Sequence, residues 1–349
     1  MPMSNKYRNH FIDAIKAIAI ILVVVGHSIQ YGSGEGILNN RLFFDNCLFK
    51  FIYSFHMPLF MMVSGYLFYF STAKHTLNHN IKTRIFSLLV PIAIWALPPF
   101  IYYIIENYQH ITFGKFILSY LSYMTSSLWF LWAILFCSLI VLMVKYLFND
   151  SLIIYFMGLI ATFFVPDTIP AVLKFMLPYF LTGYWFNKYF EANIKNHFST
   201  KKYFIGLSLS GVAFFILLIF YNRDSYIYTT GYYILKEPYY LFQIIIDIYR
   251  FFVGLLGSIF IILTVKLALT KLPKLLIMAL SFIGKSSLWI YAISGYIFTY
   301  ILPTITSQNL TINYAVVLVQ TAVIIVLSIA IGVLITKIPI LNRLLFGGR

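Results

Sequence analysis

Long apolar runs alternate with short polar segments along almost the whole chain. A helix that crosses the ~30 Å hydrocarbon core of a bilayer needs ~20 mostly apolar residues, at ~1.5 Å per residue. Ten runs approach or reach that length, and they lie near residues 10–30, 43–70, 85–106, 126–147, 151–166, 171–189, 203–221, 240–265, 286–302 and 313–337. The pattern predicts an all-α polytopic membrane protein with about ten transmembrane helices.

The first apolar run carries three ionisable side chains, Asp13, Lys16 and His27. At ~100° per residue, a helix brings Lys16 and His27 to within ~20° of each other, with Asp13 ~60° from Lys16 on the same side. Ionisable side chains at membrane depth are costly unless they are paired or line a wet cavity, so this stripe indicates a functional site. The plainer alternative is an Asp13–Lys16 pair near the membrane boundary and a histidine that is hydrogen-bonded inside a helix bundle.

The second apolar run places another histidine, His56, at membrane depth just before Pro58. Because proline lacks a backbone N–H and crowds the preceding turn, Pro58 is expected to kink or loosen the helix near His56. Gly65 should let a neighbouring helix approach closely. A single intramembrane histidine is readily explained as a core residue, but two on consecutive helices favour a site.

Composition excludes an ordinary soluble protein. Hydrophobic residues make up 61% of the 349 residues and charged residues only 10%, against a charged share of ~25% in soluble domains. No hydrophilic block is long enough to fold by itself, so residues 1–349 are expected to form one membrane domain. The two cysteines, Cys47 and Cys137, lie in apolar runs, which predicts no disulfide framework, and no metal site is expected.

The net charge of +15 would also fit nucleic-acid binding, so the positions of the basic residues decide between the two interpretations. With a cytoplasmic N-terminus, seventeen of the 25 Lys and Arg residues fall in inner segments, four in outer segments and four within the spans. This asymmetry follows the positive-inside rule and, with an even number of spans, predicts that both termini are cytoplasmic. No basic face or soluble module is left to bind a duplex, so nucleic acid is excluded as a partner.

Four blocks of sequence, in order along the chain, resemble those of a known family. Lys16 and His27 reproduce the spacing of a basic residue and a histidine in the first span of the membrane-bound acyltransferase family 3, and Asp13 also fits. The segments FHMPLF…SGYLF, SLWFLWAILF and IGKSSLWIY resemble later blocks of that family. VVVGHS together with SFHMPLF is particularly similar to the branch of fucose 4-O-acetylases and surface-polysaccharide O-acyltransferases.

The resemblance implies an integral enzyme of the cytoplasmic (inner) membrane. Such an enzyme takes an acyl group, usually acetyl, from cytoplasmic acyl-CoA and places it on a hydroxyl of a carbohydrate or other acceptor. The key histidine of the family corresponds to His27 and its basic partner to Lys16. Many relatives have a histidine shortly after the SLWIY block, whereas this chain has Ile293 and Ser294, so any role of that later histidine does not carry over.

His27 and His56 are the candidate catalytic residues. Attack of a sugar hydroxyl on a thioester needs a base, and neutral imidazole suits that role near pH 7. His27 could deprotonate the acceptor or carry the acyl group as a nucleophile, and the sequence leaves both open; His56 would assist by orienting the acceptor or the donor. Asp13 and Lys16 lie ~16–21 Å from His27 along the helix, which fits a pair near the cytoplasmic mouth where Lys16 meets anionic CoA.

Further candidate binding residues lie beyond the first two runs. Lys82 and Arg84, at the cytoplasmic start of the third run, could bind the CoA phosphates or serve only as positive-inside anchors. Asp247 and Arg250, three residues apart, should pair on one helix face. Their pair could shape the acceptor pocket or only hold two helices together.

Trp129 and Tyr291 stand in the matched blocks and are also candidate binding residues, although packing is the commoner role of aromatic side chains. The expected partners are acetyl-CoA or another acyl-CoA, a carbohydrate or surface-glycan acceptor, and the lipid bilayer; homo-oligomer formation stays open. Two other functions fit the buried polar residues. One is a transporter or flippase of a polar solute with a proton relay of His, Asp and Lys, and the other is a membrane sensor without chemistry.

Overall fold

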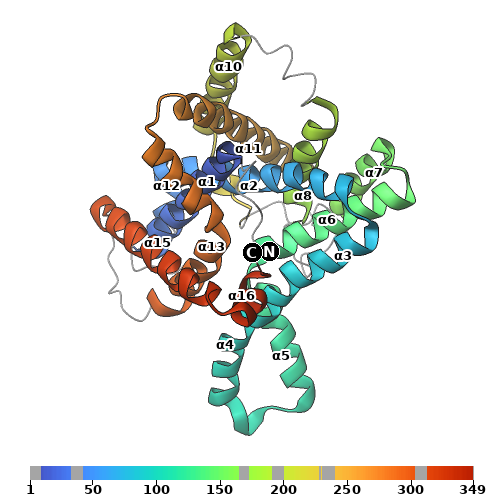
Figure 1. The fold of residues 1–349 in the computed structure, drawn as a ribbon, viewed down its shortest axis with the longest axis vertical. Coiled ribbons are helices and arrows are strands. Elements are labelled where there is room, and N and C mark those ends of the chain that lie inside the picture. The colour runs from blue at the N-terminus through green and yellow to red at the C-terminus, as the bar shows by residue number, and fades with distance from the viewer. Residues whose placement is uncertain are drawn as a thin grey trace. The chain divides into compact units, whose positions relative to one another are not determined.

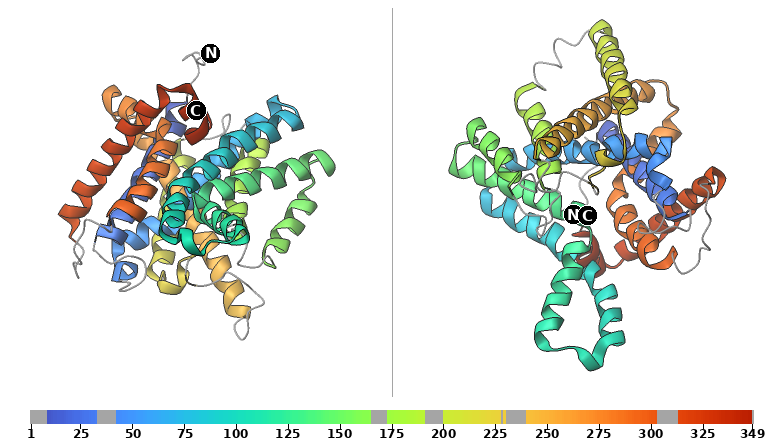
Figure 2. Two further views of the ribbon diagram at one scale, coloured as in Figure 1. Left: turned by 90° about the horizontal axis from the view of Figure 1, so that it is seen from below. Right: turned by 180° about the vertical axis from the view of Figure 1, so that it is seen from behind.

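The computed structural model describes residues 9–32, 42–164, 173–190, 200–227, 229, 240–302 and 313–348. Every regular element in these ranges is helical, which confirms the all-α fold (Figures 1 and 2). The α-helices are α1 (His10–Gly32), α2 (Cys47–Lys74), α3 (Leu77–Arg84), α4 (Val90–Asn107), α5 (Phe113–Ser126), α6 (Trp129–Leu147), α7 (Leu152–Thr162), α8 (Leu173–Trp185), α10 (Thr200–Ile219), α11 (Tyr240–Leu269), α12 (Lys274–Lys285), α13 (Ser287–Tyr296), α15 (Tyr314–Thr336) and α16 (Pro339–Phe346). Short 3-10 segments are η2 (Leu42–Asp45), η4 (Tyr108–His110) and η6 (Arg223–Ser225), and π-helical segments are η3 (Ile85–Leu89), η5 (Phe186–Phe190) and η7 (Ile297–Ile301).

Seven helices within the described residues are long and apolar enough to cross a membrane. An eighth span results if α12 and the continuous α13–η7 segment, which are bent by 59° relative to each other, count together. The runs predicted at 151–166 and 171–189 form shorter helices, α7 of 11 residues and α8 of 13 residues. The chain is therefore a multi-pass membrane protein, while the count of about ten spans depends on these two short helices.

Within the described residues, four helices, α3, α5, α12 and α16, lie outside the ten predicted runs. In α5, which forms a hairpin with α4 (Figure 1), serine, threonine and lysine interrupt the apolar positions. The hairpin is held by contacts of Phe100 on α4 with Phe116 and Tyr120, and the Tyr120 hydroxyl donates to the Ala93 carbonyl at 3.0 Å. A search for long apolar runs overlooks such a short amphipathic helix.

The chain divides into two compact units. Unit 1 comprises Met1–Val63, Tyr189–Thr230 and Ile245–Gly332, and unit 2 comprises Ser64–Lys188, Gly231–Ile244 and Val333–Arg349. In unit 1, α1 packs along α12 and α13. A Cβ atom on Gly284 of α12 would lie 1.9 Å from the Asp13 carbonyl oxygen, so this close approach of α12 to α1 requires glycine.

In unit 2, α6 packs against α8 and α3. Gly65, in the part of α2 that belongs to unit 2, has the role predicted for it, because a Cβ there would lie 1.9 Å from the Phe180 carbonyl oxygen on α8. α2 itself runs from Cys47 to Lys74 with Pro58 inside it, so the proline does not interrupt the helix next to His56.

Candidate active site

His27 lies near the C-terminal end of α1 and faces Tyr53 of α2. His27 Nδ1 is 3.4 Å from both Gln30 Oε1 and the Tyr53 hydroxyl oxygen, and the Tyr53 hydroxyl donates to Gln30 Oε1 at 3.1 Å. Gly26 makes this approach feasible, because a Cβ atom there would lie 2.6 Å from Cε2 of Tyr53. The segment 26–30 of α1 therefore supplies the histidine, its hydrogen-bonding amide and the space for the tyrosine ring.

His56 is buried one helical turn beyond Tyr53, with 4% of its surface exposed. Its Nδ1 lies 2.7 Å from the Ile52 carbonyl oxygen. A carbonyl oxygen only accepts, so Nδ1 carries the hydrogen and Nε2 of the neutral ring keeps the lone pair. The Tyr53 ring meets the His56 ring edge-to-face with 4.8 Å between centroids. Tyr53 thus contacts both intramembrane histidines.

A wall of aromatic rings also contacts His27. The Phe298 ring centroid lies 5.5 Å from that of His27, and Phe298 stacks on Tyr31 at 5.6 Å. Phe298 belongs to η7, a π-helical segment, and such segments occur frequently at functional sites. His27 therefore contacts Tyr53 and Gln30 as well as this aromatic wall.

Asp13 and Lys16 form the predicted pair near the start of α1, with Lys16 Nζ 4.0 Å from Asp13 Oδ1. The Lys16 side chain keeps 24% of its surface exposed, against 8% for Asp13. Lys16 lies ~16 Å along the axis from His27 at 1.5 Å per residue, so the two do not touch.

Asp247 and Arg250 also pair as predicted, with Arg250 Nη1 donating to Asp247 Oδ1 at 2.9 Å. The same guanidinium donates to three backbone carbonyls, those of Ser225 at 2.7 Å, Asp224 at 2.9 Å and Tyr226 at 2.8 Å. Four bonds to α11 and to the segment 224–226 use most of the five N–H donors of arginine. This geometry favours the role of holding two elements together over direct contact with an acceptor.

Tyr226, which Arg250 holds through its carbonyl, packs behind Tyr53. Its ring centroid lies 5.6 Å from that of Phe49 and 6.3 Å from that of Tyr53, and its hydroxyl donates to the Phe44 carbonyl at 3.1 Å. Burial raises the pKa of Tyr226 above its ordinary value, so the phenol remains a neutral donor. Arg250 thereby supports Tyr53 indirectly, through the Tyr226 ring.

Three of the predicted binding residues, Lys82, Arg84 and Trp129, belong to unit 2. The Arg84 guanidinium lies over the buried Phe68 ring at 4.5 Å, while Lys82 is exposed. Trp129 begins α6 and packs edge-to-face on Phe130 at 5.8 Å. Tyr291 lies in unit 1, half-buried on α13, which packs against α1.

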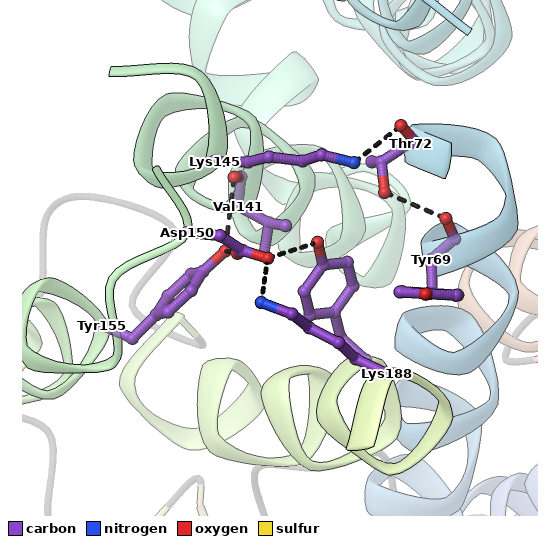
Figure 3. Close-up of polar contacts among 8 residues, drawn as sticks. Tyr69, Thr72, Val141, Lys145, Asp150, Tyr155 and Lys188 are labelled. Carbon is purple, nitrogen blue, oxygen red and sulfur yellow. Dashed lines mark hydrogen bonds and ion pairs between the residues drawn. The ribbon is translucent and has the colours of Figure 1, made fainter. Parts of the chain in front are cut away.

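A second polar cluster, which the sequence did not indicate, gathers around Asp150 in unit 2 (Figure 3). Asp150 lies in the turn between α6 and α7 and has a left-handed backbone with φ of 60°. Its carboxylate accepts from Tyr155 at 2.6 Å and from Tyr184 at 3.4 Å, and forms an ion pair with Lys188. Nearby, Lys145 donates to the Thr72 carbonyl at 2.7 Å.

Tyr53, Gln30, Tyr31 and Phe298 are members of the His27 site that the sequence analysis missed. Tyr53 lies three residues before His56 and Gln30 three residues after His27, so helical spacing would have placed each on the face of its histidine. Phe298 carries no such signal, because its contact with His27 joins residues far apart in sequence. Within the described residues, no group of three or more His, Cys, Asp or Glu gathers as metal ligands would.

Comparison with known proteins gives a consistent result over most of the chain. Residues 9–337 match the family described as an acyltransferase domain. Nodulation protein NolL of Mesorhizobium japonicum is 29% identical over 230 residues, which cover 65% of this chain and 60% of that protein. Nodulation protein NolL of Sinorhizobium fredii is 30% identical over 229 residues, which cover 62% of this chain and 58% of that protein. The match thus spans about three fifths of the length of these relatives, and no solved structure matches the chain.

Proposed function

Because this chain belongs to the acyltransferase family, whose match covers residues 9–337, we propose that it is a membrane-bound O-acyltransferase. It takes an acyl group from cytoplasmic acyl-CoA, with acetyl-CoA as the donor, and transfers it to a hydroxyl of a carbohydrate or surface glycan. Residues 1–349 act as one acyltransferase domain in the cytoplasmic membrane, with both termini in the cytoplasm.

The observation that carries this proposal is the contact of Tyr53 with both His27 and His56 inside the apolar helices of unit 1. His27 Nδ1 faces the side-chain amide oxygen Oε1 of Gln30, which only accepts, so the neutral ring presents the lone pair of Nε2. In the proposed step, Nε2 takes the proton of the acceptor hydroxyl while the hydroxyl oxygen attacks the thioester carbonyl carbon. The C–S bond then breaks, and the imidazolium returns the proton to the departing CoA thiolate.

The position of Lys16 supports the donor side of the proposal. A CoA phosphate held by Lys16 would lie ~16 Å along α1 from His27, a distance suited to the long, flexible phosphopantetheine arm that separates the phosphates of CoA from its thioester. Asp13, 4.0 Å from the ammonium, orients Lys16. On the sequence pattern alone, Arg84 and Lys82 are candidate cations for donor phosphates, and Trp129 and Tyr291 are candidate aromatic contacts to a substrate.

The glycan acceptor in this proposal rests on the resemblance of VVVGHS and SFHMPLF to surface-polysaccharide O-acyltransferases. The names of the two relatives refer to nodulation and specify no acceptor. His56 assists by orienting the acceptor, because its lone pair at Nε2 can accept a hydrogen bond from a second sugar hydroxyl.

The test uses the purified full-length protein in nanodiscs, acetyl-CoA labelled in the acetyl group, and a panel of isolated surface glycans. We expect the label to appear in a base-labile ester on one glycan, with an equal amount of free CoA released. Solute counterflow in proteoliposomes, without consumption of the thioester, would contradict the proposal and establish the transporter alternative instead.

A further inference from the structure

An open, mainly apolar groove of about 920 Å³ lies on unit 1. It follows α10 from Leu207 to Ile219, with Phe260 of α11 on its wall. Lys50, Cys47 and Tyr221 line it as well, where the N-terminal end of α2 meets the C-terminal end of α10. The groove lining contains none of the residues that contact His27.

The length and polarity of this groove match those of a lipid chain. From Leu207 to Ile219 the helix rises ~18 Å, slightly more than the ~15 Å of one half of the hydrocarbon core. The charge distribution of the chain predicts that α10 runs outward, so Lys50 and Tyr221 lie at the outer end of the groove and the apolar wall extends inward.

Lys50 indicates the charge of the occupant. It lies in the first turn of α2 and is half-buried, and in the part of the chain that the structure describes no hydrogen bond or ion pair to its ammonium is found. An ammonium beside an apolar surface at membrane depth is costly without an anion. A compact, flexible ammonium is well suited to a phosphate at the end of an apolar chain.

The polar end of the groove lies close to the candidate active site. The Tyr221 ring contacts the Tyr226 ring with 5.0 Å between centroids, and Tyr226 in turn contacts Tyr53 at 6.3 Å. Tyr53 contacts His27. A headgroup at Lys50 would therefore hold its attached sugars close to His27, since, among the described residues, only the rings of Tyr221, Tyr226 and Tyr53 lie between. This proximity favours a lipid that carries a glycan, because a lipid without one has no group to place at the transfer site.

We propose that this groove binds the acceptor as a lipid-linked glycan, with its apolar chain along α10 and its phosphate at Lys50. This inference rests on the proposed acyltransferase function and names the class of its acceptor. The apolar wall and Lys50 have separate roles. The wall supplies affinity because it buries the apolar chain of the lipid. The Lys50 ammonium selects a lipid phosphate over an uncharged lipid alcohol.

The first test measures binding without turnover. The full-length protein in phosphatidylcholine nanodiscs is labelled with a photoreactive isoprenyl phosphate, and the cross-linked peptides are mapped. We expect labels on α10 and α2, and a reduction of about fivefold or more in Lys50→Glu, since a basic residue near the membrane surface contributes ~1 kcal/mol toward an anionic lipid. Val212→Trp and Ser208→Trp, at exposed positions that line the groove, should reduce labelling by filling it.

Two variants of α10 serve as matched controls. Leu209→Trp adds the same ring at a position that is 68% exposed but does not line the groove, and Lys201→Glu makes the same charge change at the opposite end of the helix. Neither should reduce labelling. Equal labelling by an uncharged isoprenol, or unchanged labelling in Lys50→Glu, would overturn the phosphate assignment, and equal displacement by phosphatidylglycerol would overturn the assignment of the groove to the acceptor.

The second test separates the groove from the proposed function. Acetyl transfer to an isoprenyl-phosphate-linked glycan should exceed transfer to the same glycan without its lipid, and Val212→Trp should abolish this advantage. If the wild-type protein transfers acetyl to neither form while the labelling pattern holds, the proposed function fails and the lipid site stands. Equal transfer to both forms by the wild type would overturn the lipid-linked acceptor and leave the function in place.

Discussion

The two polar clusters of this protein, one around His27 in unit 1 and one around Asp150 in unit 2, satisfy their polar atoms to different degrees. Both Asp150 carboxylate oxygens have partners, including Tyr155 at 2.6 Å and the ammonium of Lys188 (Figure 3). His27 Nδ1 has two contacts of 3.4 Å, at the long limit of hydrogen bonding, and Nε2 has no hydrogen-bond partner among the described residues.

This difference concerns the free energy that is lost when a polar group leaves water and is buried among apolar helices. An ionisable group with little contact to water is stable when protein partners replace the water, as they do around Asp150, whose side chain keeps 14% of its surface exposed. A histidine that is positioned on one nitrogen while the other keeps an unengaged lone pair is instead prepared for proton transfer. We therefore propose that the Asp150 cluster contributes stability and that the His27 cluster carries the chemistry.

Replacement of His27 by alanine gives the largest expected effect and tests whether the His27 cluster carries out the proton transfer. We expect kcat for acetyl transfer to fall by ~10²–10⁴, the usual contribution of general-base catalysis. The thermal midpoint should change little, because the two hydrogen bonds that are lost are long. Purified variants are compared by CoA release and by thermal unfolding in detergent. His56→Ala is the matched control, and its smaller effect should appear mainly in KM for the acceptor.

The opposite ranking would reverse the assignment of the two histidines. If His56→Ala were inactive and His27→Ala retained near-normal turnover, His56 would be the base. If both variants kept normal activity, the acyltransferase mechanism proposed for unit 1 would fail.

Replacement of Asp150 by alanine tests whether the Asp150 cluster stabilises the fold. It removes the acceptor of two tyrosine hydroxyls and leaves the Lys188 ammonium without its carboxylate, so we expect unfolding to become easier by ~2–3 kcal/mol. The measurement is the midpoint of thermal unfolding, together with kcat per folded molecule, which should stay unchanged. A drop in kcat without loss of stability would show that Asp150 takes part in the reaction.

The sequence predicted local features of both units better than contacts between helices. The Asp13–Lys16 and Asp247–Arg250 pairs were foreseen because both partners lie three residues apart on one helix. The Asp150–Lys188 pair was not, because it joins distant segments. When a helix is apolar over most of its circumference, its hydrophobic pattern no longer reports which side faces a neighbour.

The same limit explains which residues of the candidate site could be identified from the sequence and which could not. His27, His56 and Lys16 were identified because ionisable side chains are unusual in an apolar run, and the family resemblance also pointed to Lys16 and His27. Phe298 could not be identified, since phenylalanine is common throughout a chain with 35 of them. Its contact with His27 depends on the π-helical η7, whose extra residue per turn changes the direction of the side chain.

A pair of tyrosine variants sharpens the comparison at the level of single hydroxyl groups. Tyr53→Phe removes the hydroxyl near His27, and Tyr155→Phe removes the one on Asp150. One hydrogen bond contributes ~0.5–1.5 kcal/mol, which corresponds to about twofold to tenfold. For Tyr53→Phe we expect kcat to fall by this factor while KM for acetyl-CoA stays constant. For Tyr155→Phe we expect the free energy of unfolding to fall by this amount. Equal effects of both variants on kcat would remove the distinction between the clusters.

The smallest expected effect concerns the cations of unit 2 that are proposed to bind the donor. The Arg84 guanidinium is held over the Phe68 ring, whereas Lys82 is exposed. A guanidinium that is already oriented loses less side-chain entropy when it binds a phosphate, so Arg84→Ala should raise KM for acetyl-CoA by about twofold to fivefold, the range of a partly exposed charge pair. KM for the acceptor should stay constant, and Lys82→Ala, as the matched control, should change the donor KM less. Equal increases for both variants, suppressed by added salt, would mean that the two residues act only through the positive surface potential of the cytoplasmic face.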